Sequence, residues 1–132
     1  MRSLIFAGIQ RYSLFSPNHV GNDAAIFSAV AQYLKENGHQ VNMYTEQEFL
    51  TNSLKGEKYI FTMMRSKASV RKLQKLEEKE DCFAVNSGHG IENCTRERMT
   101  TLLLENQISH PRSLIWDTND GCLLYTSDAA DD

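Results

Sequence analysis

Apolar residues along the chain fall into short continuous runs separated by longer stretches with helical spacing. Residues 3–9, 59–64 and 82–85 are such runs, and residues 40–44 form a weaker, alternating one. Continuous apolar runs of this length are typical of strands covered on both faces, as in parallel sheets. We therefore expect four β-strands at these positions.

The stretch after the first run predicts a polar loop and then a long helix. Residues 10–22 form the expected loop, and Asn22 or Asp23 is the expected cap of a helix that stops at Gly38. The large apolar side chains at helical spacing, which should face the core, are Ile26, Val30, Tyr33 and Leu34.

Two more helical segments are expected before the fourth strand. Residues 46–52 predict a short helix or turn, and Ser66 or Ser69 caps a helix that runs to about Asp81. In the second of these helices the residues expected to face inward are Val70, Leu73 and Leu76, and those expected to face water are Lys72, Lys75, Glu77 and Glu78.

Strands thus alternate with helices along the chain, and a fifth strand is expected to begin at residues 113–116. This alternation predicts βαβ units with right-handed crossovers, and hence parallel pairing of the strands. The expected fold class is α/β: a Rossmann-like three-layer domain with a mostly parallel sheet of four or five strands.

Ligands of open parallel sheets bind in the crevice beyond the carboxyl ends of the strands. Polar residues expected there come from the loop after the first strand, from the end of the third strand and from the turn after the fourth. They are Ser16, Asn18, His19, Asn22, Arg65, Asn86 and Ser87. A long polar loop between a strand and a helix is itself often functional. The alternative for this loop is an ordinary surface segment whose Asn22 and Asp23 only cap the helix.

Two of these positions suggest binding of an anion. A guanidinium at Arg65 can hold a carboxylate or phosphate through two parallel hydrogen bonds, although a solvated arginine that begins a basic helix is the alternative. The turn at residues 86–90 presents free amide donors at a helix start. It lacks the third glycine of a dinucleotide-binding loop, since Asn93 occupies that position. His89 is expected to be a turn residue and not a catalytic base.

A second basic position lies further along the chain. If Thr95 caps the next helix, Arg96 falls in its first turn, where the helix dipole disfavours a positive charge. An arginine at such a position suggests an anionic ligand. Arg98 is the second candidate for the same role.

Residues 122–132 resemble the translation of a sequencing-library adapter, the transposase end sequence used to tag DNA fragments. We expect this tail to be non-native and the natural sequence to be truncated near residue 121. The chain has 14 Lys and Arg against 17 Asp and Glu, and three of the acids lie in the tail: Asp128, Asp131 and Asp132. Without them the charges balance, which argues against binding to nucleic acid or to an anionic membrane.

Other compositional signals place the protein in the cytoplasm. Cys82 and Cys94 have no paired spacing, which favours a reducing compartment over a disulfide framework. No apolar stretch is long enough to span a bilayer. The four histidines are scattered, so no metal site is expected in this chain.

Residues 84–111 resemble the end of the first domain of the ATP-grasp carboxylate ligases. That family has an apolar strand, Asn-Ser or Asn-Pro, a short helix, a basic residue, a leucine-rich helix and then Gly-Ile-Pro-x-Pro. The positions that match are Asn86, Ile91, Arg96, Leu103, Ile108 and Pro111, and Gln107 stands where the family has glycine.

The resemblance implies that residues 1–112 are a pre-ATP-grasp domain and that residues 113–121 begin a linker into an ATP-grasp domain. It implies a parent enzyme that activates a small-molecule carboxylate as an acyl phosphate, with ATP and magnesium, and couples it to a nucleophile. Arg96, with Arg98 second, would contact the nucleotide phosphates. The magnesium ligands would lie in later domains. This chain alone is therefore expected to be inactive, to contain no catalytic residue and to bind no cofactor tightly.

Two other readings compete with this one. Residues 16–21 resemble the Pro- and Gly-containing loop of nucleotide-sugar glycosyltransferases, and residues 38–41 resemble the Gly-His-x-Val motif of the same family. That family does not require the Asn86 to Pro111 spacing. A non-catalytic α/β binding module of receiver type would need acidic residues at the ends of the first and third strands, where this chain has Gln10 and Met63-Met64.

Overall fold

The computed structural model describes residues 2–11, 17–79 and 81–113, with the backbone alone for residues 17–20. By its internal contacts the chain divides into two compact units, residues 1–91 and residues 92–132. The first unit contains β1 (Ile5–Gln10), α1 (Pro17–Glu36), β2 (Gln40–Thr45), α2 (Glu46–Thr51), β3 (Tyr59–Thr62), α3 (Lys67–Glu78) and β4 (Phe83–Val85). Helix α4 (Gly88–Asn93) follows β4, and α5 (Arg96–Glu105) belongs to the second unit.

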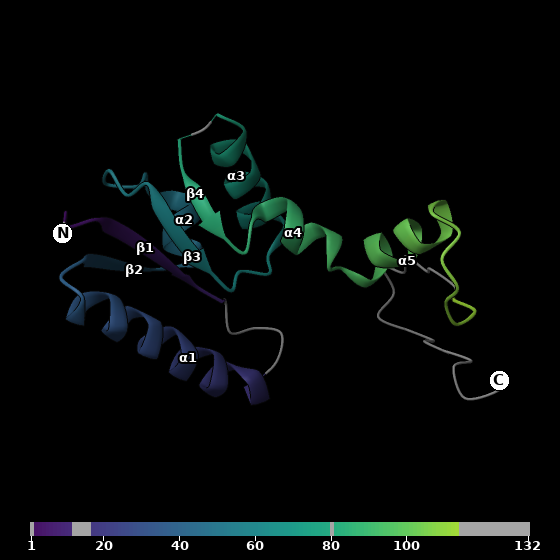
Figure 1. Cartoon of the computed structure of the whole chain (residues 1–132), viewed down its shortest axis with the longest axis horizontal. Coiled ribbons are helices and arrows are strands. Elements are labelled where there is room, and N and C mark those ends of the chain that lie inside the picture. Colours follow the sequence, from purple (N-terminus) through teal and green to yellow (C-terminus); the bar gives the residue numbers. More distant parts are fainter. Residues whose placement is uncertain (1, 12–16, 80, 114–132) are drawn as a thin grey trace. The chain divides into compact units, whose positions relative to one another are not determined.

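The four strands form one parallel sheet in the order β2-β1-β3-β4. Helix α1 covers one face of this sheet, and α2 and α3 cover the other (Figure 1). The expected α/β fold with a parallel, Rossmann-like sheet is therefore confirmed. Of the fifth strand expected at residues 113–116, only Ser113 is described, and it is not in a strand.

The main hydrophobic core lies between the sheet and helices α2 and α3. Every second side chain of the central strands points to this face, because successive residues of a strand alternate between the two faces of the sheet. The buried residues of the cluster are Ala7, Ile9, Phe49, Ile60, Met64, Val70 and Leu73. The prediction that Val70, Leu73 and Leu76 face inward is confirmed, with Leu76 partly buried against the cluster.

The stripe predicted for α1 was wrong for three of its four residues, and the fourth, Leu34, is half-buried. Ile26, Val30 and Tyr33 are 55%, 39% and 66% exposed. The buried residues are Phe27 and Ala31, and the Phe27 ring packs 4.9 Å, centre to centre, from Phe61 of β3. Because Ile26-Phe27 and Val30-Ala31 offer two adjacent apolar stripes, helical spacing alone does not choose between them. The aromatic contact with β3 favours the stripe that contains Phe27.

The predicted start of α1 was also wrong, since the helix begins at Pro17 and not at Asn22 or Asp23. Proline suits the first helical position because its fixed φ is already helical and its missing N–H would have no partner there. Residues 17–22 of the predicted loop are therefore helical. The end was predicted correctly: Gly38 has φ +83°, and the His39 N–H donates to the Leu34 carbonyl at 3.1 Å.

The caps of the two short helices follow local sequence rules. Thr45 and Glu48 form a capping box at the start of α2. Of the two serines considered for α3, Ser66 is the cap, and its Oγ accepts the Ser69 N–H at 3.2 Å.

Lys72 does not face water as predicted. Its Nζ donates to the carbonyls of Phe49 and Asn52 and lies 4.7 Å from the centre of the Phe49 ring. These carbonyls lie at the end of α2, where a helix carries partial negative charge. Lys72 therefore ties α3 to the end of α2, and burial lowers the pKa of its amine.

Gly88 allows α4 to begin against α3. A Cβ at this position would lie 3.0 Å from the Gln74 nitrogen and 3.1 Å from the Val70 carbonyl oxygen, which are backbone atoms. We expect Gly88→Ala to lower the free energy of unfolding by about 2 kcal/mol, because the helices must separate to admit the methyl group. Urea unfolding measures this. The matched control is Gly21→Ala on α1, where an added Cβ meets nothing within 4 Å and should slightly stabilise the helix. Equal effects of the two substitutions would contradict the packing account.

A buried carboxylate lies between β2 and the start of β3. Glu57 is 3% exposed, and its Oε1 accepts hydrogen bonds from Asn42 Nδ2 at 2.7 Å and from the Tyr44 hydroxyl at 2.5 Å. Burial raises the pKa of Glu57, but the hydrogen bonds from Tyr44, Asn42 and the backbone outweigh it, so the pKa is lowered. Burial and the neighbouring Glu57 charge raise the pKa of Tyr44 to about 12.

The raised pKa of Tyr44 predicts a loss of stability at high pH. The neutral phenol is favoured in the folded state, so its contribution is complete below the ordinary pKa of 10.0 and is lost as the pH rises through about 12. We expect the free energy of unfolding of the wild type to fall faster than that of Tyr44→Phe across this interval. Denaturant unfolding at a series of alkaline pH values measures the difference. Parallel profiles for the two proteins would contradict the assignment.

Candidate functional site

The carboxyl ends of β1 and β3 lie side by side, and the chain leaves them in opposite directions. From β1 the chain returns through α1 to β2 on one side, and from β3 it returns through α3 to β4 on the other. Such a switch point is where open parallel sheets form a ligand crevice. The residues that follow the two strands here are Arg11 after β1 and residues 63–65 after β3.

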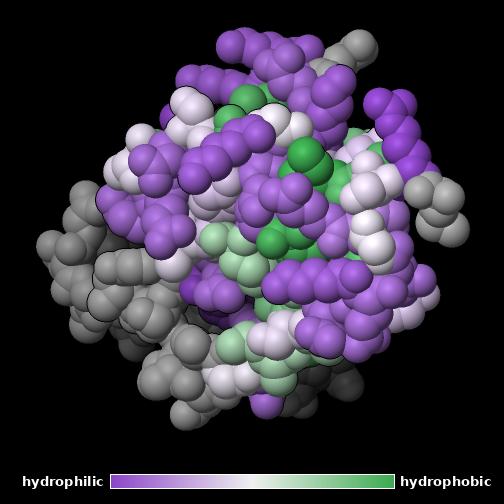
Figure 2. All heavy atoms as spheres, turned by 90° about the vertical axis from the view of Figure 1, so that its left-hand side faces the viewer, coloured by the Kyte–Doolittle hydropathy of each residue, from purple (hydrophilic) through white to green (hydrophobic). Residues whose placement is uncertain are grey.

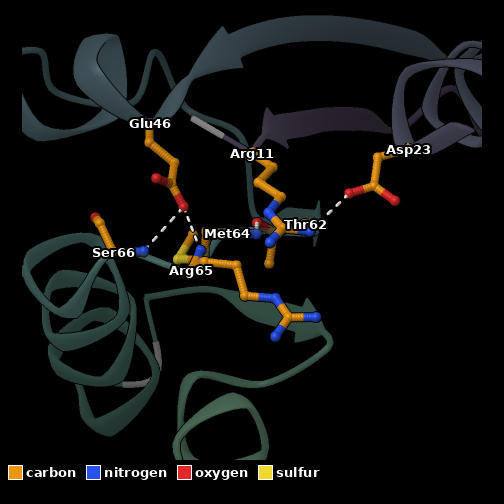
Figure 3. Close-up of polar contacts among 7 residues, drawn as sticks. All are labelled: Arg11, Asp23, Glu46, Thr62, Met64, Arg65 and Ser66. Carbon is orange, nitrogen blue, oxygen red and sulfur yellow. Dashed lines mark hydrogen bonds and ion pairs between the residues drawn. The ribbon is translucent and has the colours of Figure 1, made fainter. Parts of the chain in front are cut away.

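Buried polar groups fix the backbone that follows β3. Glu46 of α2 is 2% exposed, and its Oε1 accepts the backbone N–H groups of Arg65 and of Ser66, the latter at 3.3 Å (Figure 3). The Thr62 hydroxyl donates to the Ile9 carbonyl at 3.1 Å and accepts the Met64 N–H at 3.0 Å. The turn is therefore held by side chains from two different elements before any ligand is present.

The two arginines of this edge differ in their partners. Arg11 Nη1 lies 3.3 Å from Asp23 Oδ2 of α1, and both side chains are mostly buried. The Arg65 side chain is exposed and extends away from Glu46 (Figure 3). Its guanidinium forms no ion pair with any residue that the structure describes. Arg65 is thus an exposed cation on a fixed backbone.

The residues predicted after β4 have structural roles. Asn86 adopts φ +59°, and its Nδ2 donates to the Thr62 carbonyl at 2.8 Å, which links the ends of β3 and β4. The Ser87 hydroxyl accepts the Gly90 N–H at 3.0 Å at the start of α4. His89 is exposed on α4, with its Nε2 3.5 Å from Glu78 Oε1. The structure thus brings Asn86 to the same edge as Arg65.

Four of the candidate ligand-binding residues, Ser16, Asn18, His19 and Asn22, come from the segment at the start of α1. Asn18, His19 and Asn22 lie in α1 and not in a loop, and Asn22 is exposed. The side chains of Asn18 and His19, and Ser16 as a whole, lie outside the described residues.

Arg96 and Arg98 belong to the second unit. Thr95 is the N-cap of α5, and its hydroxyl accepts the Arg98 N–H at 3.2 Å, so the prediction that Arg96 falls in the first turn is confirmed. Glu97 shares this turn and offsets part of the unfavourable dipole interaction. A role for either arginine toward phosphate stays a prediction.

Sequence reasoning missed Arg11 and Glu46. The position of Glu46 could be predicted, because the Thr45-x-x-Glu48 capping box places it in the first turn of a helix that directly follows a strand. Its hydrogen-bond partners could not. Its partners are 19 and 20 residues away in sequence. No local pattern predicts such a pairing.

Two surface hollows lie elsewhere and contain no predicted site residue. One of about 340 Å³ is lined by the loop before β3 and by the end of α3, and one of about 710 Å³ lies along β2 and the end of α2. Arg65 lines neither hollow, so the candidate site at Arg65 is defined by its charge and its fixed backbone.

No protein-family model, no curated protein and no solved structure matches the chain. The resemblance to the ATP-grasp ligases therefore rests on the motif at residues 84–111. Among the residues with described positions, no three His, Cys, Asp or Glu side chains group so that they could bind a metal ion. Within the same residues no helix has both the length and the apolarity of a membrane span.

Proposed function

We propose that this chain is the first domain of an ATP-dependent carboxylate ligase and that its crevice binds the carboxylate substrate. The observation that carries the proposal is the exposed Arg65 guanidinium at the switch point, on a backbone fixed by the buried Glu46. A guanidinium binds a carboxylate through two parallel hydrogen bonds, and a fixed backbone reduces the entropy lost on binding.

In this proposal the residues of this chain bind and orient the carboxylate substrate, and they perform no covalent step. Arg65 neutralises the carboxylate, while Thr62 and Asn86 hold the ends of the neighbouring strands together around it. ATP supplies the phosphoryl group in the complete enzyme, and Arg96 is the residue proposed to contact its phosphates. Magnesium does not fit the described residues, since they contain no grouping of ligands for it. No role toward the metal is assigned to this chain.

The geometry favours this proposal over a glycosyltransferase domain. The glycosyltransferase reading depends on a loop containing Pro17 and Gly21, and both residues lie in α1. The motif after β4, in contrast, keeps its expected layout of strand, Asn86 turn, short helix and a helix that begins at Arg96.

Reading the source DNA past codon 121 tests the proposal. We expect the frame to continue into at least one further domain, of about 150 residues, with a glycine-rich strand and loop, a lysine and a late Glu and Asn pair. A natural stop codon after Asp132 would overturn both the adapter assignment and the ligase proposal.

A further inference from the structure

The half of the sheet formed by β3 and β4 carries exposed apolar side chains on the side of α1. Phe61 of β3 packs against Phe27 of α1, so its side chain points to that side, and so does the side chain of Tyr59, two residues earlier in the same strand. In the parallel register Phe83 lies beside Tyr59 and Val85 beside Phe61, so both β4 side chains point the same way. Phe83 and Val85 are 67% and 60% exposed, and Tyr59 is 37% exposed.

Helix α1 forms a wall beside this half of the sheet. It packs over β1 and β2, and of the helices α1, α2 and α3 only α1 lies on this side (Figure 1). Its exposed residues Ile26, Val30 and Tyr33 form one stripe, and Ile26 is turned by about 100° from the buried Phe27 about the helix axis. Because the helix and the crossover from β1 to β2 are both right-handed, this stripe is turned toward β3 and β4 and away from β2.

The two sets of side chains form one surface, which we call the apolar face. Its members are Ile26, Val30, Tyr33, Tyr59, Phe83 and Val85. Given about 150–250 Å² for a whole aromatic side chain, their exposed fractions amount to roughly 600 Å². A monomer seldom exposes so large a continuous apolar patch. On the side of the molecule drawn in Figure 2, by contrast, most described residues at the surface are hydrophilic.

We propose that a second copy of this chain covers the apolar face, with the two α1 helices side by side and antiparallel across a two-fold axis near Val30. Each copy has one exposed helix stripe and one uncovered half-sheet, so a two-fold axis lets each copy supply what the other lacks. Tyr33 of one copy then contacts Ile26 of its partner. The outer side of each α1, with the small exposed residues Ala25 and Ala29, faces β3 and β4 of the partner.

The size and chemistry of the apolar face fit this occupant. Standard interfaces bury about 800 Å² on each partner, which the apolar face and a polar rim can supply. None of its six members is charged, so it has nothing to attract a nucleic acid or an anionic membrane. The face lies on the side of the sheet, whereas Arg65 follows the carboxyl end of β3. The inference therefore does not depend on the ligase proposal.

Sedimentation equilibrium of the full chain over a concentration series tests the proposal. We expect a monomer–dimer equilibrium with a micromolar dissociation constant, because the interface is at the small end for specific complexes. Tyr33→Glu should weaken dimerisation at least tenfold, since it places a charge between two apolar stripes. Ser28→Glu adds the same charge to an exposed residue on the opposite flank of α1 and should change the constant less than about two-fold. A wild type that stays monomeric at about 1 mM, or equal effects of the two variants, would overturn the proposal.

Complementary charges test the antiparallel pairing of the helices. Ile26→Glu and Tyr33→Lys should each weaken self-association at least tenfold. An equimolar mixture of the two should form a mixed dimer at least tenfold tighter than either variant alone, because the new carboxylate meets the new ammonium group across the interface. The matched control is a mixture of Ile26→Glu with Tyr33→Glu, which should show no recovery. Both positions are exposed in the single chain, so circular dichroism should show an unchanged fold. A mixture of the first two variants no tighter than each alone would refute the pairing.

Discussion

Replacing Glu46 by alanine should lower the free energy of unfolding by about 3 kcal/mol, because it removes a charged acceptor from two backbone N–H groups. Those groups belong to Arg65 and Ser66, which lie 19 and 20 residues away in sequence and form the turn after β3. Glu46 is 2% exposed, so water cannot fully replace the lost acceptor. Urea unfolding monitored by circular dichroism measures the change.

Two other variants separate the hydrogen bonds from the rest of the side chain. Glu46→Gln keeps an acceptor oxygen of the same reach and should cost about 1 kcal/mol. Gln47→Ala changes the next, exposed residue of α2 and should cost less than about 0.5 kcal/mol. If Glu46→Ala were as mild as Gln47→Ala, the turn after β3 would not depend on this carboxylate.

Replacing Arg65 by glutamine should reduce the affinity for a small carboxylate at least tenfold. Sodium propionate is a suitable probe, because it is a carboxylate with only a short alkyl group attached. The expected loss follows from the strength of charge-assisted, two-fold hydrogen bonds between guanidinium and carboxylate, of about 1.5–3 kcal/mol. The fold should not change, because the Arg65 side chain is exposed and its contribution to the turn is its backbone N–H.

The matched control for this substitution is Arg71→Gln, an exposed arginine on α3. It removes the same charge from the protein without touching the turn after β3, so affinity for propionate should stay within about two-fold. Arg65→Lys keeps the charge and loses the planar fork, and should fall between wild type and Arg65→Gln. Equal losses in the Arg65 and Arg71 variants would indicate a general charge effect and no site.

The four described strands and their parallel pairing could be predicted from the sequence, whereas the strand order and the rotation of α1 could not. Apolar runs such as residues 59–64 have few structural alternatives, and their alternation with helices determines parallel pairing. In α1, Ile26 and Phe27 are adjacent and equally apolar, so the choice between them depends on Phe61 on another strand. The helix start was missed because a Pro- and Gly-containing stretch also suits a loop.

In the candidate site too, some features could be predicted from the local sequence, and others depend on residues that are far apart in the sequence. Arg65 was predictable, because a basic residue directly after an apolar strand must lie at the carboxyl edge of a parallel sheet. Asn86 was predictable at that edge for the same reason. The support from Glu46, and the ion pair that occupies Arg11, join residues far apart in sequence and became visible only in the structure.

An amide NMR titration of the wild-type chain with sodium propionate is the most direct test of the carboxylate crevice. The account predicts saturable shifts centred on the backbone amides of residues 62–66, with the largest at Arg65 and Ser66, and no comparable shifts with 1-propanol. Saturable shifts confined to other parts of the chain, or no shifts at residues 62–66, would contradict it.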